Sequence, residues 1–209
     1  MKLYSAPDPA PNPRRVRIFM VEKGIALPEV MLSLREREHK AEAFRAKNPW
    51  GQVPMLELDD GRTISETVAI CRYLEGLHPT PALFGRDAFE QAEVEMWIRR
   101  VEFTLMLPVG QFWRHAHPYT AHLLTQFKDF GESNRDGFAA ACILMDRGLS
   151  DGRAFLAGEA YTMADICALT TLDFARFIGL EPPAKAERLA AWRSRVSARP
   201  SATVEPVAA

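Results

Sequence analysis

Residues 1–77 alternate short apolar stretches, which suit strands, with segments whose apolar residues recur at helical spacing. Helices are expected after Pro13 and after Ser65. The charged segment 35–47, with Phe44 as its clearest apolar residue, predicts a weak surface helix or a loop. The order is then strand, helix, strand, weak helix, strand, hairpin strand, helix. The expected strands cover 2–6, 28–34, 53–58 and 63–64.

Capping and turn residues indicate where these elements begin and end. Asn12 is a preferred helix cap and Pro13 suits a first helical position, so the first helix is expected to begin there. Gly24 is typical of a helix C-terminus. The Asp-Gly pair at 60–61 predicts a hairpin turn, and Ser65 is expected to cap the next helix.

Beyond residue 77 the pattern is helical throughout. The segment 78–87 contains prolines and a glycine and is expected to be a linker. Thr162 followed by Asp165 is a variant of the capping box, a structural motif at a helix start. The sequence therefore predicts two domains, over 1–77 and 88–209. The expected helices of the second domain cover 88–117, 119–149 with a break near Gly131, 162–178 and 184–198.

Composition and charge narrow the class of protein. The 26 Lys and Arg nearly balance the 27 Asp and Glu, which argues against a nucleic-acid partner. No apolar run approaches the ~18 residues of a membrane span, and residues 1–15 lack the apolar core of a secretory signal, so no membrane partner is expected. Cys71, Cys142 and Cys167 form no CxxC motif or zinc cluster. They are expected to be buried packing residues of a cytoplasmic protein.

Three longer segments carry motifs that occur together in one known family. They are NPRRVRIFMVEKGI, NPWGQVPMLELDDG leading into ISETVAICRYLE, and FLAGEAYTMADICAL. They resemble the cytosolic glutathione transferase family over nearly the whole chain. The resemblance implies an α/β thioredoxin-like N-terminal domain and an all-α helical-bundle C-terminal domain. It also implies glutathione as co-substrate, a small hydrophobic electrophile as second substrate, no metal, and a homodimer.

The segment 52–54 is the first expected glutathione contact. The resemblance implies a cis bond before Pro54, with the backbone of Val53 pairing with the cysteinyl part of glutathione and Gln52 near the glycyl end. The physical reading agrees, because proline enters a strand only at an edge or another special position. The alternative is an ordinary trans proline at a strand start.

Two further contacts are implied for the ends of the tripeptide. At the helix start after Ser65, Thr67 would bind the γ-glutamyl carboxylate and Glu66 the ammonium group, since helix N-termini favour anions. The alternative is that Ser65 and Glu66 serve only the helix. Lys40, beside His39, would contact the glycyl carboxylate, unless this segment is a solvated charged loop.

The residue that activates the thiol departs from the family pattern. Ala10 occupies the position where many relatives carry Ser or Cys, and its side chain cannot donate a hydrogen bond. Asn12 is the best replacement, although it could be purely a helix cap. On the first strand Ser5 is a second candidate, whereas Tyr4 faces the opposite side and is expected in the core. The arginines at 14–17 either add positive potential or form a solvated face.

The expected activity is transfer of the glutathione thiol to an electrophile. One alternative is a glutathione-dependent disulfide or peroxide reductase. The other is a non-catalytic binding or assembly module with the same fold, which the alanine at position 10 keeps open. The missing CxxC motif argues strongly against a thioredoxin-like oxidoreductase that uses its own cysteines.

Overall fold

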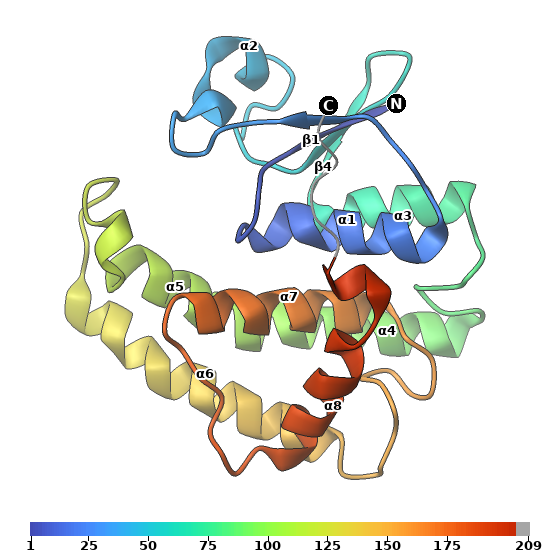
Figure 1. Ribbon diagram of the computed structural model, residues 1–209, viewed down its shortest axis with the longest axis vertical. Helices are drawn as coiled ribbons and strands as arrows, with labels where there is room; N and C mark the ends of the chain where they lie inside the picture. Colours follow the sequence, from blue (N-terminus) through green and yellow to red (C-terminus); the bar gives the residue numbers. More distant parts are fainter. Residues whose placement is uncertain (204–209) are drawn as a thin grey trace. The chain divides into compact units, whose positions relative to one another are not determined.

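The computed structural model describes residues 1–203 (Figure 1). The chain divides into two units, one formed by residues 1–83 with the segment from Arg199 and the other by residues 84–198. The boundary at Leu83 lies inside the expected linker 78–87. Residues 199–203, assigned to the helical domain from the sequence, return instead to the first unit.

The first unit is built on a four-stranded mixed sheet in the order β2-β1-β3-β4. The central strand β1 pairs parallel to β2 and antiparallel to β3, with Leu3 opposite both Glu29 and Leu56. Strands β3 and β4 form the expected hairpin. The strands are β1 (Lys2–Ser5), β2 (Glu29–Met31), β3 (Met55–Glu57) and β4 (Thr63–Ser65).

Two helices of this unit, α1 (Pro11–Lys23) and α3 (Thr67–Leu77), lie side by side and pack together (Figure 1). Charged segment 35–47 forms only the short elements η1 (Glu38–Lys40) and α2 (Glu42–Arg45), as its weak pattern predicts. Helix α1 ends at Gly24, whose φ of 63° suits glycine, so this prediction is confirmed. The apolar residues buried in this core include Leu3, Val16, Phe19, Leu56, Ile70 and Leu74.

Both helix starts differ from the prediction. Helix α1 begins at Pro11 with Ala10 as its cap, so Asn12 is the second helical residue and not the cap. The reason is that Pro11 already suits the first helical position and holds Ala10 in an extended conformation. Ser65 is the last residue of β4, paired with Met55, and therefore cannot cap α3. The residue at the cap position is Glu66, at φ 72° and ψ 123°.

The second unit is helical. The expected long helix 88–117 is present as α4 (Ala88–Arg100), a π-helical segment η2 (Val101–Met106) and α5 (Leu107–His115), followed by η3 (Pro118–Thr120). Helix α7 (Met163–Phe177) contacts α4, η2, α5 and α8, and most of its residues are buried, so it is the centre of this core. The remaining helices are α6 (Lys128–Gly148) and α8 (Glu187–Ser197).

Two buried aspartates hold helix starts in this unit. Asp165 accepts hydrogen bonds from the Thr162 backbone at 2.9 Å and from Trp192 Nε1 at 2.8 Å, which confirms the predicted capping box at α7. Asp146, on α6, accepts from the backbone N–H groups of Arg188 at 2.7 Å and Leu189 at 3.1 Å, in the first turn of α8. Asp146 therefore caps a helix that begins about 40 residues later in the chain.

The break predicted near Gly131 is present a few residues earlier, at 121–127 between η3 and α6, and α6 runs through Gly131 itself. A Cβ at Gly131 would lie 2.6 Å from backbone atoms of His115 and Ala116. The glycine is therefore required for a close approach of α6 to the end of α5, and not for a break. At Gly137, in the same helix, a Cβ would meet only Pro108 at 3.5 Å, an ordinary contact.

The segment that returns to the first unit is held by α1. Arg199 forms a bidentate ion pair with Glu22, at 2.8 and 2.6 Å, and Arg14 Nη2 donates to the carbonyl of Ala202 at 2.7 Å. The three cysteines are buried and free, as expected. Within residues 1–203, no helix has both the length and the apolar character that crossing a membrane requires.

Candidate functional site

An open pocket lies in the first unit, and it covers about 280 Å³ of space, part of which is open solvent. Three segments of the chain form it: the first turn of α1, the loop that precedes β3, and the junction between β4 and α3. These segments are far apart in the sequence but meet at one end of the sheet. The residues that line the pocket are Asn12, Asn48, Trp50, Gln52, Val53, Pro54, Ser65, Glu66 and Thr67.

The loop before β3 is fixed by side chains from its own neighbourhood. Asn48 Nδ2 donates to the carbonyl of Gln52 at 2.8 Å, and Lys40 Nζ donates to the carbonyl of Gly51 at 2.6 Å. Gly51 has φ 56°, and a Cβ there would lie 2.8 Å from a backbone oxygen. The Val53-Pro54 bond is cis, as the resemblance implied. The loop backbone is therefore held in place, while the Trp50 side chain is 76% exposed at the pocket rim.

Lys40 takes a different place from the one expected of it. Its ammonium group bonds to loop carbonyls and the residue does not line the pocket. Partial burial, together with the charges of Arg45 and Arg37, lowers the pKa of Lys40. The structure thus makes Lys40 a support of the loop.

The α3 side of the pocket combines an unusual backbone with one charge. Glu66 is one of two residues other than glycine with positive φ in the described chain, the other being Arg37. Among the described residues that line the pocket, Glu66 alone has an ionisable side chain. Thr67 is buried and is the first residue of α3, where backbone N–H groups are not used within the helix.

The α1 side presents the helix tip. Pro11 and Pro13 carry no amide hydrogen, so among the first three residues of α1 only Asn12 can offer a backbone N–H. Its side-chain amide is a second donor. Asn12 lines the pocket, so the positive end of the helix dipole lies there, at a residue that carries both kinds of donor.

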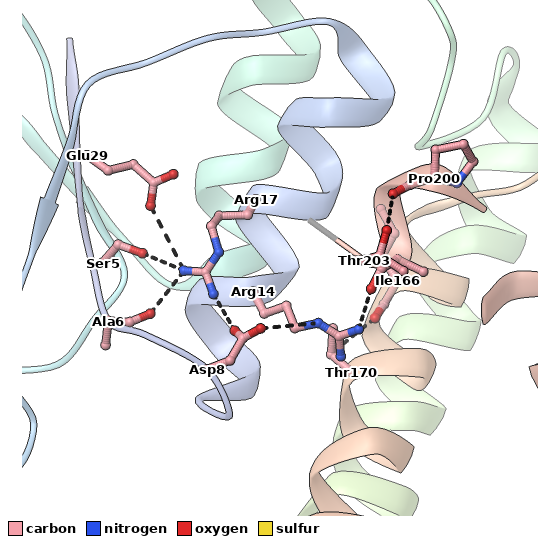
Figure 2. A network of polar contacts seen from close by, with 11 residues as sticks. Ser5, Ala6, Asp8, Arg14, Arg17, Glu29, Ile166, Thr170, Pro200 and Thr203 are labelled. Carbon is pink, nitrogen blue, oxygen red and sulfur yellow. Dashed lines mark hydrogen bonds and ion pairs between the residues drawn. The ribbon is translucent and has the colours of Figure 1, made fainter. Parts of the chain in front are cut away.

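Ser5 does not line the pocket. It is fully buried, and its hydroxyl accepts a hydrogen bond from Arg17 Nη1 at 2.9 Å, as Figure 2 shows. Tyr4 points the other way, as strand alternation predicts, but it is only half-buried. Its hydroxyl donates to Glu57 at 2.8 Å and accepts from Lys47 at 3.0 Å, so the expectation of a core tyrosine is wrong.

The pocket gathers six of the eight residues proposed from the sequence. They are Asn12, Gln52, Val53, Pro54, Glu66 and Thr67. Sequence reasoning missed Asn48 and Trp50, although both lie in the NPWGQVP motif. Within the described residues, no group of three or more His, Cys, Asp or Glu is arranged to hold a metal ion.

A thioredoxin-like domain with this pocket, followed by an all-helical domain, is the architecture of glutathione transferases. Residues 10–77 match the family described as Glutathione S-transferase, N-terminal domain. Residues 140–200 match Glutathione S-transferase, C-terminal domain. Both halves of the chain thus point to the same family.

Individual proteins agree with this. Glutathione S-transferase 2 of Saccharomyces cerevisiae is 38% identical over 205 residues, which cover 96% of this chain and 87% of the relative. The structure of Gtt2 from the same yeast matches with a TM-score of 0.89 and 37% identity, over 96% of this chain and 98% of that one. The structure of a glutathione S-transferase domain-containing protein of Marinobacter aquaeolei VT8 matches with a TM-score of 0.90 and 38% identity. The match covers 97% of this chain and 100% of that one. The chain belongs to the glutathione S-transferase family.

Proposed function

We propose that this chain binds glutathione in the pocket of its first unit and transfers the thiol to small hydrophobic electrophiles. The observation that carries the proposal is that three separate segments bring Asn12, Val53, Glu66 and Thr67 to one open pocket. A tripeptide requires hydrogen-bonding groups along its length, and these three segments offer backbone, amide, hydroxyl and carboxylate groups for that role.

The lining residues divide the recognition of the tripeptide. The α3 N-terminus, with the Thr67 hydroxyl, takes the γ-glutamyl carboxylate, since a helix tip favours an anion. The Glu66 carboxylate takes the ammonium group as a charge-assisted hydrogen bond. Val53 pairs its backbone with the cysteinyl residue, and Gln52 lies toward the glycyl end.

The N-terminus of α1 activates the glutathione thiol in this proposal. A free thiol has a pKa of about 8.5, and a helix N-terminus lowers it because the thiolate is favoured there. Asn12 supplies N–H donors to the thiolate, the role that the alanine at position 10 cannot fill. The thiolate sulfur then attacks an electrophilic carbon, forms the C–S bond, and the leaving group departs with its electron pair.

We also propose that the chain is a homodimer, the association typical of this family. Phe89, Met96 and Phe103 recur at seven-residue intervals on α4 and η2, and are 71%, 39% and 64% exposed. An apolar stripe at this spacing suits packing against a second copy of the same face. Sedimentation should give a dimer that the substitution Phe103→Asp weakens.

A glutathione-dependent thermal shift and an activity assay test the proposal together. At a glutathione concentration one hundred times Kd, linkage adds about 2.7 kcal/mol to the free energy of unfolding. The same sample should conjugate a chlorinated dinitroaromatic. Binding without conjugation, accompanied by reduction of a peroxide or disulfide, favours the reductase. Binding with neither reaction favours the non-catalytic module, and the absence of any thermal shift contradicts the proposal.

Two variants test whether the glutathione-dependent thermal shift comes from binding in the pocket. Thr67→Val removes the hydroxyl proposed to hold the carboxylate and should reduce the thermal shift. Thr63→Val removes a hydroxyl from the neighbouring strand β4, where Thr63 is exposed and donates to the Lys47 carbonyl at 3.1 Å. Thr63 does not line the pocket, so this control should keep the full shift.

A further inference from the structure

The connection between β1 and α1, together with the first turn of α1, has few backbone donors. Four of the eight residues from Ala6 to Pro13 are prolines, which carry no amide hydrogen. The Ala10 N–H donates to the Pro7 carbonyl over 3.3 Å, a long bond. This connection leads directly into the first turn of α1, where Asn12 lines the pocket. Because backbone hydrogen bonds are few, we expect side chains to hold the connection in position.

Arg17 supplies the hydrogen bonds that the prolines cannot. Figure 2 shows its guanidinium on the inner side of the connection, where it donates to Ser5 Oγ at 2.9 Å, to the Ala6 carbonyl at 3.0 Å and to the Asp8 carboxylate. Long side chains on a helix point back toward its N-terminus, so a residue five positions after Asn12 reaches the connection. The planar guanidinium can bond to several acceptors in one fixed geometry.

The guanidinium is also deeply buried, since Arg17 is only 2% exposed. Asp8 bonds to it, and the buried Glu29 lies 3.9 Å from its Nη1. Burial of a charge is costly unless it is paired and hydrogen-bonded, and breaking one partner leaves the other uncompensated. The Arg17–Asp8 pair thus fixes the connection in one geometry.

We propose that Arg17 and Asp8 are positioning residues for thiol activation: they hold the connection, and with it the first turn of α1, so that Asn12 faces the pocket. This inference rests on the proposed function. The loop before β3 is held separately by Asn48 and Lys40. Loss of the Arg17–Asp8 contact should therefore affect the thiol more than the binding of the tripeptide.

Asp8→Asn is the main test, because it keeps the shape of the side chain and removes its charge at a position that is 41% exposed. We expect the pKa of the bound thiol to rise, read from the ultraviolet absorption of the thiolate against pH. A displaced catalytic group lowers kcat, here by about tenfold, while the Kd for glutathione stays within about twofold. Asp8→Glu, which keeps the charge, should retain part of the lowered thiol pKa and part of the wild-type kcat.

Two further variants complete the experiment. Arg17→Lys keeps the charge but loses the multiple hydrogen bonds, so it should shift the thiol pKa in the same direction. Asp60→Asn is the matched control, since Asp60 is also an exposed loop aspartate paired with an arginine, Arg62, and does not line the pocket. It should leave the thiol pKa, kcat and Kd unchanged.

The two proposals fail in different ways. A wild-type protein that does not bind glutathione contradicts the proposed function itself. If the wild type binds glutathione with a lowered thiol pKa, but Asp8→Asn and Arg17→Lys keep that pKa and only lower the melting temperature, the contact is purely structural. That result overturns the positioning role while the proposed function stands.

Discussion

Replacing Glu66 by glycine should strengthen the fold and weaken glutathione binding at the same time. Glu66 sits at φ 72° and ψ 123°, a conformation that side chains with a Cβ rarely adopt. It is also the proposed partner of the γ-glutamyl ammonium group. The substitution removes the backbone strain and the carboxylate together, and the two effects have opposite signs.

The magnitudes follow from the conformation and from the proposed contact. Strain of this kind costs about 1 to 3 kcal/mol, and glycine gives back about 0.5 to 1 kcal/mol through its freedom in the unfolded chain. The net gain in the free energy of unfolding is up to about 2.5 kcal/mol, or up to about 10 °C in Tm. A hydrogen bond to a charged group contributes about 1.5 to 3 kcal/mol, so affinity should fall about 10- to 150-fold.

Thermal unfolding without ligand and a glutathione titration measure the two effects separately. Glu66→Gln, which keeps the strain and loses the charge, should weaken binding without raising Tm. Arg37→Gly is the matched control for strain, because Arg37 has φ 57° and does not line the pocket. It should raise Tm and leave the affinity unchanged. A Glu66→Gly protein that binds glutathione as tightly as the wild type would refute the assignment of Glu66.

The remaining predictions concern the pocket rim and the helical unit. Glutathione should change the fluorescence of Trp50, because its exposed ring lines the pocket, and Trp50→Phe should abolish most of that change. Gly131→Ala should lower the free energy of unfolding by about 1 to 3 kcal/mol through the clash with backbone atoms. Gly137→Ala, in the same helix, should raise it by up to about 1 kcal/mol. Asp146→Asn should destabilise the protein at neutral pH by about 1 kcal/mol, since it weakens a helix cap.

The Asp146 effect has a defined pH dependence. Burial alone would raise the pKa of Asp146, but the hydrogen bonds from Leu189 and Arg188 outweigh it and hold the pKa below its usual value. A lowered pKa in the folded state contributes stability above the unfolded value of about 3.9, and this stability is lost as the pH falls through the lowered value. The difference between wild type and Asp146→Asn should therefore disappear in strong acid. A difference that stays constant down to that range would contradict this assignment.

Equal stabilities for Gly131→Ala and Gly137→Ala would contradict the close approach of α6 to the end of α5. An unchanged emission on glutathione binding, measured in the wild type, would place the ligand away from Trp50.

Features fixed by local chemistry were predictable from the sequence. The end of α1 at Gly24 and the capping box at Asp165 are each encoded within a few neighbouring residues. The pocket residues at 52–54 and 66–67 were instead expected from the family resemblance of the motifs that contain them. Motifs of this kind are visible in a single stretch of sequence.

Features that depend on distant partners were not predictable. For the arginines at 14–17, one expectation was exposure to solvent. Arg17 is instead buried, and it contacts Ser5, Asp8 and Glu29, which are distant in sequence or outside the helix. A glycine at position 131 suggested a helix break, because the sequence does not reveal that the backbone of another helix approaches this residue closely. At the start of α1 two prolines competed for the first helical position, and local preference for an Asn cap favoured the wrong one.

Calorimetric titration of the wild-type protein with glutathione and with cysteinylglycine tests the central claim most directly. The dipeptide lacks the γ-glutamyl carboxylate and ammonium groups that the α3 tip and Glu66 are proposed to bind. We predict one glutathione site per chain and at least about tenfold weaker binding of cysteinylglycine. Equal affinity for the two peptides, or no binding of glutathione, would contradict it.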